Sequence, residues 1–353
     1  MKVTRFTLFL LLWLAACGPA GGAGAPTPAG PRTLTVMTHD SFDMSEALLR
    51  AFESENNVTV RILKSGDTGE ALGKAILAKG RPLADVFYGV DNAFLSRALA
   101  EEVFEPYNAP ALAGIPDTFE LDPQHGALPV DFGDVCVNYD KRYFAANNVP
   151  PPATLEDLTQ PAYKDLLVVQ NPATSSPGLA FLLATVGHFG ADGYLDYWQA
   201  LRDNGVLVVN DWETAYYSEF SGASGAGPRP MVVSYGSSPP FEMIYAETPP
   251  AEPTTAALVS AGACFRQIEF VGILAGTANR DLAERWVDFM LGTRFQEDLP
   301  LKMFVFPVNP EAKLDETFQM WMALPEQTAE VSPADIAAHR EEWIEAWTNV
   351  VLR

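Results

Sequence analysis

Short apolar runs alternate with amphipathic stretches from residue 33 to near the end of the chain. Alternation and β-branched side chains predict a strand over 33–38. The same reasoning predicts further strands at 58–63, 84–90, 166–169, 206–209 and 231–234. Apolar positions at helical spacing predict helices at 43–57, 69–79, 179–189, 193–202, 212–220 and 281–291, and a last helix that opens at Ser332-Pro333. Alternating strands and helices predict an α/β fold, which binds ligands at the carboxyl ends of its strands.

The first 32 residues follow a different pattern. Lys2 and Arg5 precede an apolar run over 6–13, which is too short to span roughly 30 Å of hydrocarbon. Small residues then lead up to a cysteine, as in a signal peptide, so we expect 1–16 to be removed. The sequence Leu-Ala-Ala-Cys resembles a bacterial lipobox, which implies a lipid on Cys17. The alternative is an ordinary signal with an incidental cysteine.

The segment that follows the lipobox supports a lipoprotein. Residues 18–32 are Gly, Ala or Pro at all but two positions. Such a composition cannot bury a core and is typical of a flexible linker. We therefore expect 17–32 to tether a membrane-anchored protein outside the cytoplasm, on the outer face of the cytoplasmic membrane or in the periplasm.

Composition narrows the function classes. The 353 residues carry 23 Lys and Arg against 45 Asp and Glu, a formal net charge of −22. A chain this acidic, without a basic stripe, is a poor partner for nucleic acid or an anionic bilayer. The four histidines show no metal-ligand spacing, and no glycine-rich phosphate loop precedes a helix. We therefore predict neither a metal site nor a bound cofactor.

Export changes the reading of the other two cysteines, because disulfides persist outside the cytoplasm. Cys136 and Cys264 both lie in stretches that read as strand or strand edge. A disulfide between them is favoured. The alternative is two buried free thiols, since free cysteine packs as a small hydrophobe.

Polar and aromatic residues gather after several of the expected strands. Ser176 and Pro177 are expected to cap and open a helix, with free backbone N–H groups nearby. The other turns of this kind are 38–42, 89–92, 210–217 and 234–239. Aromatics mixed with carboxylates and hydroxyls suit a flat, partly cationic organic ligand. Plain capping and core packing are the alternatives for each residue alone.

These turns carry a resemblance to a known family. An exported lipoprotein of this size with α/β elements resembles the substrate-binding proteins of ABC importers, and more narrowly their thiamine-binding branch. The matching segments are Thr38-His39-Asp40-Ser41-Phe42, Gly89-Val90-Asp91-Asn92, Asp131-Phe132-Gly133, Thr174-Ser175-Ser176-Pro177-Gly178, Trp212-Glu213-Thr214-Ala215-Tyr216, Ser234-Tyr235 with Ser237-Ser238-Pro239, and Phe306-Pro307-Val308.

The resemblance implies a two-lobed periplasmic-binding-protein fold of type II, with two crossover strands at the hinge. The first lobe would hold 33–136 and 267–353, and the second 137–266, with the C-terminal helices free to pack across both. Thiamine, or a thiamine phosphate, would close between the lobes and pass to an ABC permease and its ATPase. A monomer without enzymatic activity is expected.

The resemblance also implies site residues. The residues expected to stack on a flat ring are Trp212, Tyr216, Tyr235 and Phe304. Those expected to balance the ligand's charge are Asp40, Asp91 and Asp131. Ser175, Ser176 and the adjoining N–H groups would bond the ligand's own hydroxyl or phosphate. The other expected ligand-binding residues are Ser41, Ser237 and Ser238. Relatives commonly have a tryptophan where this chain has Met303-Phe304, and a phenylalanine stacks but donates no hydrogen bond.

Three alternatives stay open. Tyr216-Tyr217 resembles the tyrosine pair of ferric-iron-binding relatives, although consecutive helical residues point about 100° apart. A polyamine is another small cation that such a site suits. An exported serine hydrolase is the third, but there is no Gly-x-Ser-x-Gly motif, and the Gly-rich turn 221–225 has no histidine nearby.

Overall fold

The computed structural model describes residues 32–223 and 225–353. The expected signal peptide, Cys17 and all but the last residue of the expected tether lie outside the described residues. Within the described part of the chain, no helix is both long and apolar enough to cross a bilayer.

The strands form one hydrogen-bonded sheet with the order β2-β1-β3-β10-β5-β8-β6-β7. Three short strands join it at the sides, β4 on β10, and β9 and β11 on β5. The bounds are β1 Arg32–Thr38, β2 Val58–Lys64, β3 Val86–Asp91, β4 Phe104–Glu105, β5 Leu128–Asp140, β6 Leu167–Gln170, β7 Leu207–Val209, β8 Met231–Tyr235, β9 Thr255–Leu258, β10 Phe265–Leu274 and β11 Phe306–Pro307.

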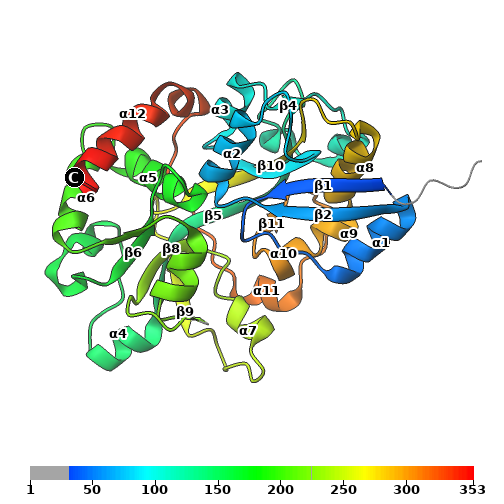
Figure 1. Ribbon diagram of the computed structural model, residues 1–353. Helices are drawn as coiled ribbons and strands as arrows, with labels where there is room; N and C mark the ends of the chain where they lie inside the picture. Colours follow the sequence, from blue (N-terminus) through cyan, green and yellow to red (C-terminus); the bar gives the residue numbers. More distant parts are fainter. Residues whose placement is uncertain (1–31, 224) are drawn as a thin grey trace, which may run out of the picture.

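Two long antiparallel strands, β5 and β10, connect the two halves of this sheet. They pair from Phe265–Val135 to Val271–Leu128. Strand β10 also pairs with β3 on one side, and β5 with β8 on the other. Figure 1 shows β5 running between the group of elements around β1 and β2 and the group around β6 and β8. The chain therefore crosses twice between the groups, inside the two strands where crossovers were expected. The assignment of residue ranges to two lobes stays a prediction.

Helices cover the sheet. The elements expected from periodicity are present, and their ends lie within three residues of the predicted ones. The α-helices are α1 Glu46–Asn56, α2 Thr68–Leu77, α3 Leu95–Ala100, α4 Lys141–Asn147, α5 Ser176–Phe189, α6 Tyr194–Asp203, α7 Phe241–Tyr245, α8 Arg280–Leu291, α9 Thr293–Gln296, α10 Leu299–Lys302, α11 Glu316–Trp321 and α12 Pro333–Val351. Short 3-10 turns (η1–η4) lie at Pro110–Gly114, Asp117–Phe119, Glu156–Thr159 and Pro161–Tyr163.

One expected helix differs in type, and one expected cap was wrong. The helix predicted over 212–220 is present, but it is mainly a π-helix, η5, over Thr214–Glu219, preceded by a short helical turn. Ser176 is the first residue of α5 rather than its cap, because Ser175 occupies the N-cap position with extended backbone. The Ser176 hydroxyl is therefore available for a tertiary contact.

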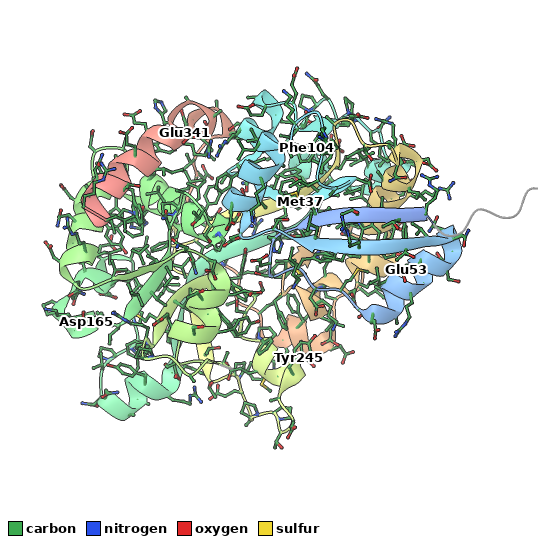
Figure 2. The ribbon with its side chains drawn as sticks, in the orientation of Figure 1. Met37, Glu53, Phe104, Asp165, Tyr245 and Glu341 are labelled. Atoms are coloured by element: carbon green, nitrogen blue, oxygen red, sulfur yellow. A yellow bond between two sulfur atoms is a disulfide. The ribbon has the colours of Figure 1, made fainter. Side chains whose placement is uncertain are left out.

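The last helix, α12, packs against α6 and the start of α3. The Ser332 hydroxyl accepts the Asp335 N–H at 3.0 Å, as expected for a cap. Trp347 packs edge-on against Trp198 of α6, with ring centroids 5.5 Å apart. The Arg340 guanidinium lies 5.2 Å above the ring of Phe94, just before α3. Figure 2 shows side chains filling the space between these helices and the sheet.

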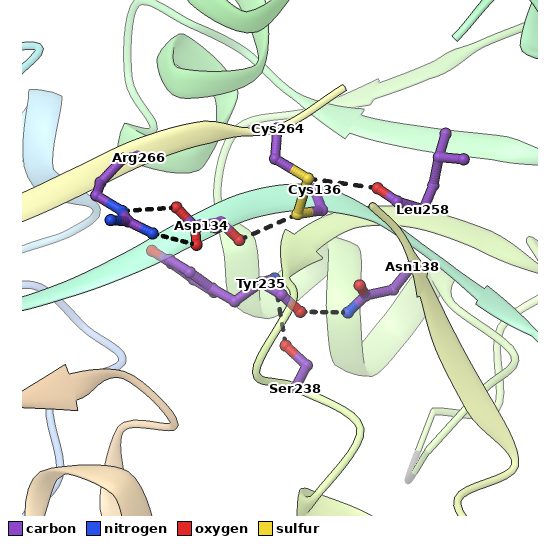
Figure 3. The surroundings of a disulfide bond; sticks show 8 residues. All are labelled: Asp134, Cys136, Asn138, Tyr235, Ser238, Leu258, Cys264 and Arg266. Atoms are coloured by element: carbon purple, nitrogen blue, oxygen red, sulfur yellow. Dashed lines mark hydrogen bonds and ion pairs between the residues drawn. A yellow bond between two sulfur atoms is a disulfide. The ribbon is translucent and has the colours of Figure 1, made fainter. Parts of the chain in front are cut away.

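A disulfide between Cys136 and Cys264 ties the two crossover strands together. Cys136 lies within β5 and Cys264 directly precedes β10, so the bond lies where the strands begin to pair (Figure 3). The buried Asp134 carboxylate and Arg266 form a two-bond ion pair on the same strands, at 2.8 and 2.9 Å. The pairing of β5 with β10 is thus held by a covalent bond and an ion pair in addition to the backbone hydrogen bonds.

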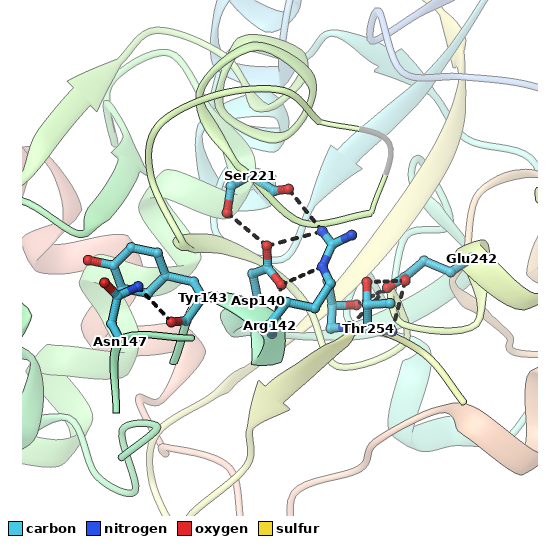
Figure 4. A network of polar contacts seen from close by, with 8 residues as sticks. Asp140, Arg142, Tyr143, Asn147, Ser221, Glu242 and Thr254 are labelled. Carbon is cyan, nitrogen blue, oxygen red and sulfur yellow. Dashed lines mark hydrogen bonds and ion pairs between the residues drawn. The ribbon is translucent and has the colours of Figure 1, made fainter. Parts of the chain in front are cut away.

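A polar network at the far end of β5 holds the Gly-rich turn (Figure 4). Asp140 accepts hydrogen bonds from the Arg142 backbone N–H at 3.0 Å and from the Ser221 hydroxyl at 3.0 Å. Glu242 accepts the Thr255 N–H at 3.0 Å nearby. The Ser221 hydroxyl therefore anchors the start of this loop to the end of β5.

Loss of the disulfide should destabilise the protein measurably. We expect Cys136→Ala/Cys264→Ala to lower the free energy of unfolding by about 2–5 kcal/mol, because the bond closes a long loop in the unfolded chain. Urea denaturation of the variant and the oxidised wild type measures this. Alkylation of denatured, unreduced protein is the control: labelling of both thiols would show that the bond is absent.

Candidate functional site

A cavity of about 320 Å³ opens at the carboxyl ends of the strands. Its lining comes from the loop after β1, the starts of α2 and α5, the π-helix η5, the region from β8 to α7, strand β10 and the segment after α10. These segments come from both predicted lobes. The volume is that of a site for a small organic molecule.

One wall of the cavity is aromatic and comes from the π-helix η5 and the helical turn before it. Trp212 and Tyr216 stack with ring centroids 4.8 Å apart and planes 16° apart. Tyr217 stands edge-on to both rings, and all three line the cavity. The Trp212 indole Nε1 donates to the Ser234 hydroxyl at 3.0 Å, which fixes the ring. Both tyrosines therefore face the cavity, contrary to the separation expected from an α-helix.

A second aromatic group comes from α7 and the segment after α10. Phe241 and Phe304 lie edge-to-face with ring centroids 5.3 Å apart, and Tyr245 lies beside them. Phe304 has a φ of +56°, which is unfavourable for a non-glycine residue. The Ser237 hydroxyl donates to the Phe304 carbonyl oxygen and so holds that backbone. Lys302 lies next to this group, with Nζ 3.5 Å from the Asp43 carboxylate.

Tyr235 occupies the position where the aromatic lining meets the crossover strands. Its hydroxyl donates to the Gln267 side-chain oxygen of β10 at 3.0 Å. A Cβ atom at Gly133 of β5 would lie 2.8 Å from the Tyr235 ring, so glycine is required for the ring to lie on that strand. Tyr235 is therefore positioned by both crossover strands.

Carboxyl groups outnumber amines in the lining. Asp43, Asp67, Glu213 and Glu269 line the cavity together with Lys64 and Lys302. The Asp67 carboxylate accepts the Thr68 N–H at 2.9 Å and the Trp212 N–H at 3.3 Å, so it links α2 to the aromatic wall. Burial raises the pKa of Asp67 to about 6.

The floor of the cavity holds buried acids. Glu269 of β10 pairs across the ladder with Asp131 of β5. The Tyr88 hydroxyl donates to Asp131 at 2.6 Å. Burial raises the pKa of Glu269 well above its usual value, and Asp131 raises it further. Burial lowers the pKa of His39 to about 4, so its imidazole, 3.5 Å from Glu269, is neutral at pH 7.

The structure brings seven of the sequence-predicted residues to the cavity. They are Ser41, Ser176, Trp212, Tyr216, Tyr235, Ser238 and Phe304. Most lie near the end of a strand or the start of a helix, as the pattern of polar turns predicts, whereas Phe304 follows α10. Their direct contact with a ligand stays a prediction.

Five predicted residues do not line the cavity. The Asp40 carboxylate accepts the Gly66 N–H at 2.8 Å and so joins the loops after β1 and β2. Asp131 is fully buried beneath Glu269. Ser175 is fully buried at the start of α5, and Ser237 binds the Phe304 carbonyl.

Asp91, the fifth, has a structural role beside the cavity. Its carboxylate accepts the Ala93 and Phe94 N–H groups at 3.0 Å each and the Ser176 hydroxyl. It is fully buried, and burial raises its pKa to about 7. Asp91 thus ties β3 to α5 rather than facing the ligand space.

Sequence reasoning missed several lining residues, chiefly Glu269, Asp67, Phe241, Tyr245 and Lys302. Glu269 had a usable signal, because a carboxylate inside the apolar run 268–274 needs a reason to be buried. Asp67 also had one, since it lies two residues before a predicted helix, where an acid can cap it. Phe241, Tyr245 and Lys302 lie in short helices without a periodic pattern.

The crossover strands and the cavity beside them define a two-lobed binding protein with the type II periplasmic-binding-protein fold. A solved structure described as a periplasmic thiamin binding protein superimposes with a TM-score of 0.78 and 26% sequence identity, covering 92% of this chain and 97% of that one. The chain belongs to the family of bacterial extracellular solute-binding proteins, whose sequence pattern matches residues 81–324.

Sequence relatives narrow the comparison. The thiamine-binding periplasmic protein of Salmonella typhimurium is 30% identical over 334 residues, which cover 93% of this chain and 96% of the relative. The thiamine-binding periplasmic protein of Brucella suis is 29% identical over 365 residues, which cover 100% of this chain and 99% of the relative. Both alignments include every segment that lines the cavity in this chain.

The buried Asp91 should make stability depend on pH. Its folded pKa of about 7 lies above the unfolded value, so its stabilising contribution is complete at acid pH and is lost as pH rises through about 7. Relative to wild type, the free energy of unfolding of Asp91→Asn should therefore rise by about 2–3 kcal/mol between pH 5 and pH 8.

Urea unfolding at the two pH values measures this difference. Asp196→Asn, at an exposed position on α6, is the matched control and should follow the wild type at both pH values. Identical pH profiles for Asp91→Asn and wild type would show that Asp91 does not titrate in this range.

Proposed function

We propose that this protein binds thiamine between its lobes and delivers it to an ABC permease and its ATPase. The observation that carries the proposal is the stacked Trp212–Tyr216 pair in a cavity with more carboxyl groups than amines. Thiamine offers a flat aminopyrimidine and a permanently charged thiazolium. Aromatic faces bind flat rings and cations, and carboxylates balance the charge.

The polar groups of the lining fit the rest of the molecule. The start of α5 and the exposed Lys64 offer donors for a hydroxyl or a phosphate, and the Ser176 hydroxyl, which donates to Asp91, offers an acceptor. Ser238 and Ser234 form a hydroxyl chain, with 2.9 Å between their oxygens, that continues to the Trp212 indole. Thiamine is the proposed ligand, and its mono- and diphosphate are the variants that the test compares.

The proposed role also implies where the protein is located and that it acts as a monomer. The relatives are periplasmic by name, and the N-terminal pattern supports export of this chain with a lipid on Cys17. A lipid tether of some fifteen residues would keep a monomeric binding protein close to its permease. The proposal assigns no catalysis to the site.

A test begins with protein purified without refolding. Native mass spectrometry should detect a bound species with the mass of thiamine or one of its phosphates, and calorimetry of the stripped protein should rank the three. Ferric citrate is the control ligand, because Tyr216 and Tyr217 both face the cavity. Burial raises the pKa of both phenols, which disfavours the phenolates that iron requires. Tight iron binding with a visible absorption band, and no heat with thiamine, would overturn the proposal.

Removal of the stacking wall should weaken thiamine binding. We expect Trp212→Ala to lower the affinity about tenfold to a hundredfold, because stacking and cation–π contacts contribute roughly 1–3 kcal/mol. Thiamine should also quench tryptophan fluorescence in wild type but not in this variant. Trp321→Ala, on α11 and away from the lining, is the matched control and should keep wild-type affinity. Equal affinities for all three proteins would exclude Trp212 from the site.

The proposed anchor has its own test. We expect Cys17→Ser to abolish lipid labelling and to move the protein from the membrane fraction to the soluble fraction. Thr27→Ser, which leaves the lipobox intact, should stay with the membrane. Membrane retention of the Cys17→Ser protein would contradict the lipoprotein assignment.

A further inference from the structure

Three adjacent strands carry an acid at the same level of the sheet. Asp91 of β3 and Asp131 of β5 each pair with Glu269 of the strand between them, β10. Directly paired residues on neighbouring strands have side chains on the same face and within contact distance. Of the three, Glu269 alone reaches the cavity lining. The other two lie beneath the surface and are fully buried.

Glu269 has one basic neighbour, the His39 imidazole 3.5 Å away, and burial lowers the pKa of His39 to about 4, so it is neutral at pH 7. The titratable or charged groups that face the row from the packed elements are Asp131, Asp91, Tyr88, His39, Asp67, Tyr235, Lys64 and Arg340. Lys64 is exposed, and Arg340 pairs with Glu341. Among the described residues, no lysine or arginine forms an ion pair with Glu269. A buried carboxylate without a countercharge is costly. In the protein without a bound cation, a proton is therefore held among the three acids Asp91, Asp131 and Glu269.

We propose that Glu269 is the specificity-determining residue that makes this cavity select a positively charged ligand, and that the ligand's charge displaces the proton that Glu269 shares with Asp131. The inference rests on the proposed function, because thiamine is the cation that tests it. A cation above Glu269 supplies the missing countercharge. The carboxyl O–H bond then breaks and its proton passes to the solvent, so the step needs no other reactant.

The direction of the pH effect follows. Ligand binding releases a proton, so acid opposes binding, and affinity for the cation should fall as pH is lowered, by up to about tenfold per pH unit for one proton. A neutral ligand of the same shape leaves the proton in place, so its affinity should not carry this dependence. A plain hydrophobic or stacking site would treat the two ligands alike.

The first experiment compares two ligands by calorimetry at pH 8. They are thiamine and its neutral thiophene isostere, which keeps the aminopyrimidine and lacks the ring charge. We expect Glu269→Gln to weaken thiamine binding about tenfold to a hundredfold and to leave the isostere within about threefold. Glu247→Gln, an exposed carboxylate outside the lining, removes the same charge and should change neither affinity. Equal binding of thiamine by Glu269→Gln and wild type would overturn the inference.

The second experiment does not depend on how well that variant folds. Wild-type binding heats are measured in buffers of different ionisation enthalpy between pH 5.5 and 8, and should report proton release with thiamine but not with the isostere. In Asp131→Asn the repulsion is gone, so Glu269 ionises more easily. Thiamine affinity should then persist to lower pH, a gain that mere destabilisation does not produce. Heats independent of buffer for thiamine would refute the proton step.

The outcomes separate the two proposals. Wild-type protein that binds neither thiamine nor its phosphates overturns the proposed function, and the inference falls with it. Wild-type protein that binds thiamine but binds the isostere equally well keeps the proposed function and overturns the role of Glu269 alone.

Discussion

The antiparallel pairing of β5 with β10 is the constraint on which the rest of the structure depends. These two strands belong to both halves of the sheet, so their register decides which residues of each half face one another. The disulfide and the ion pair between Arg266 and the buried Asp134 lie on the same strands and hold that register. Tyr235 and the acid Glu269 take their positions from this pairing. Ligand binding at the junction is therefore coupled to the one part of the fold shared by both halves.

The cavity combines two kinds of wall that differ in how they are held. The aromatic wall comes from a π-helix and the strand turns beside it, where rings are fixed by stacking and by the Trp212–Ser234 hydrogen bond. The acidic floor comes from the interior of the sheet, where the backbone ladder leaves the side chains little freedom. In the proposed complex a flat cation would contact both walls at once. Selectivity for shape and selectivity for charge thus come from separate elements of the fold.

Several polar residues of the matching turns position the site from behind. Asp40 joins two loops, Asp91 joins β3 to α5, and Ser237 holds the unusual backbone of Phe304. Each of these side chains already bonds a protein group. Contact with a ligand therefore depends on residues that neighbour them in the sequence or in space. This division explains why a turn can resemble those of ligand-binding relatives while only part of it faces the cavity.

The sequence by itself determined the alternation of strands and helices, the export pattern, the preferred cysteine pair and the aromatic turns, because these are local patterns of spacing and residue type. It also led to Trp212 and Tyr235, which lie near strand ends, and to Ser176 at the start of a helix. Only the tertiary structure decided that Glu269 lies between Asp91 and Asp131, since that depends on pairing between strands far apart in the chain. The same holds for Tyr216 and Tyr217, which both face the cavity in a π-helix whose geometry no periodic pattern indicates.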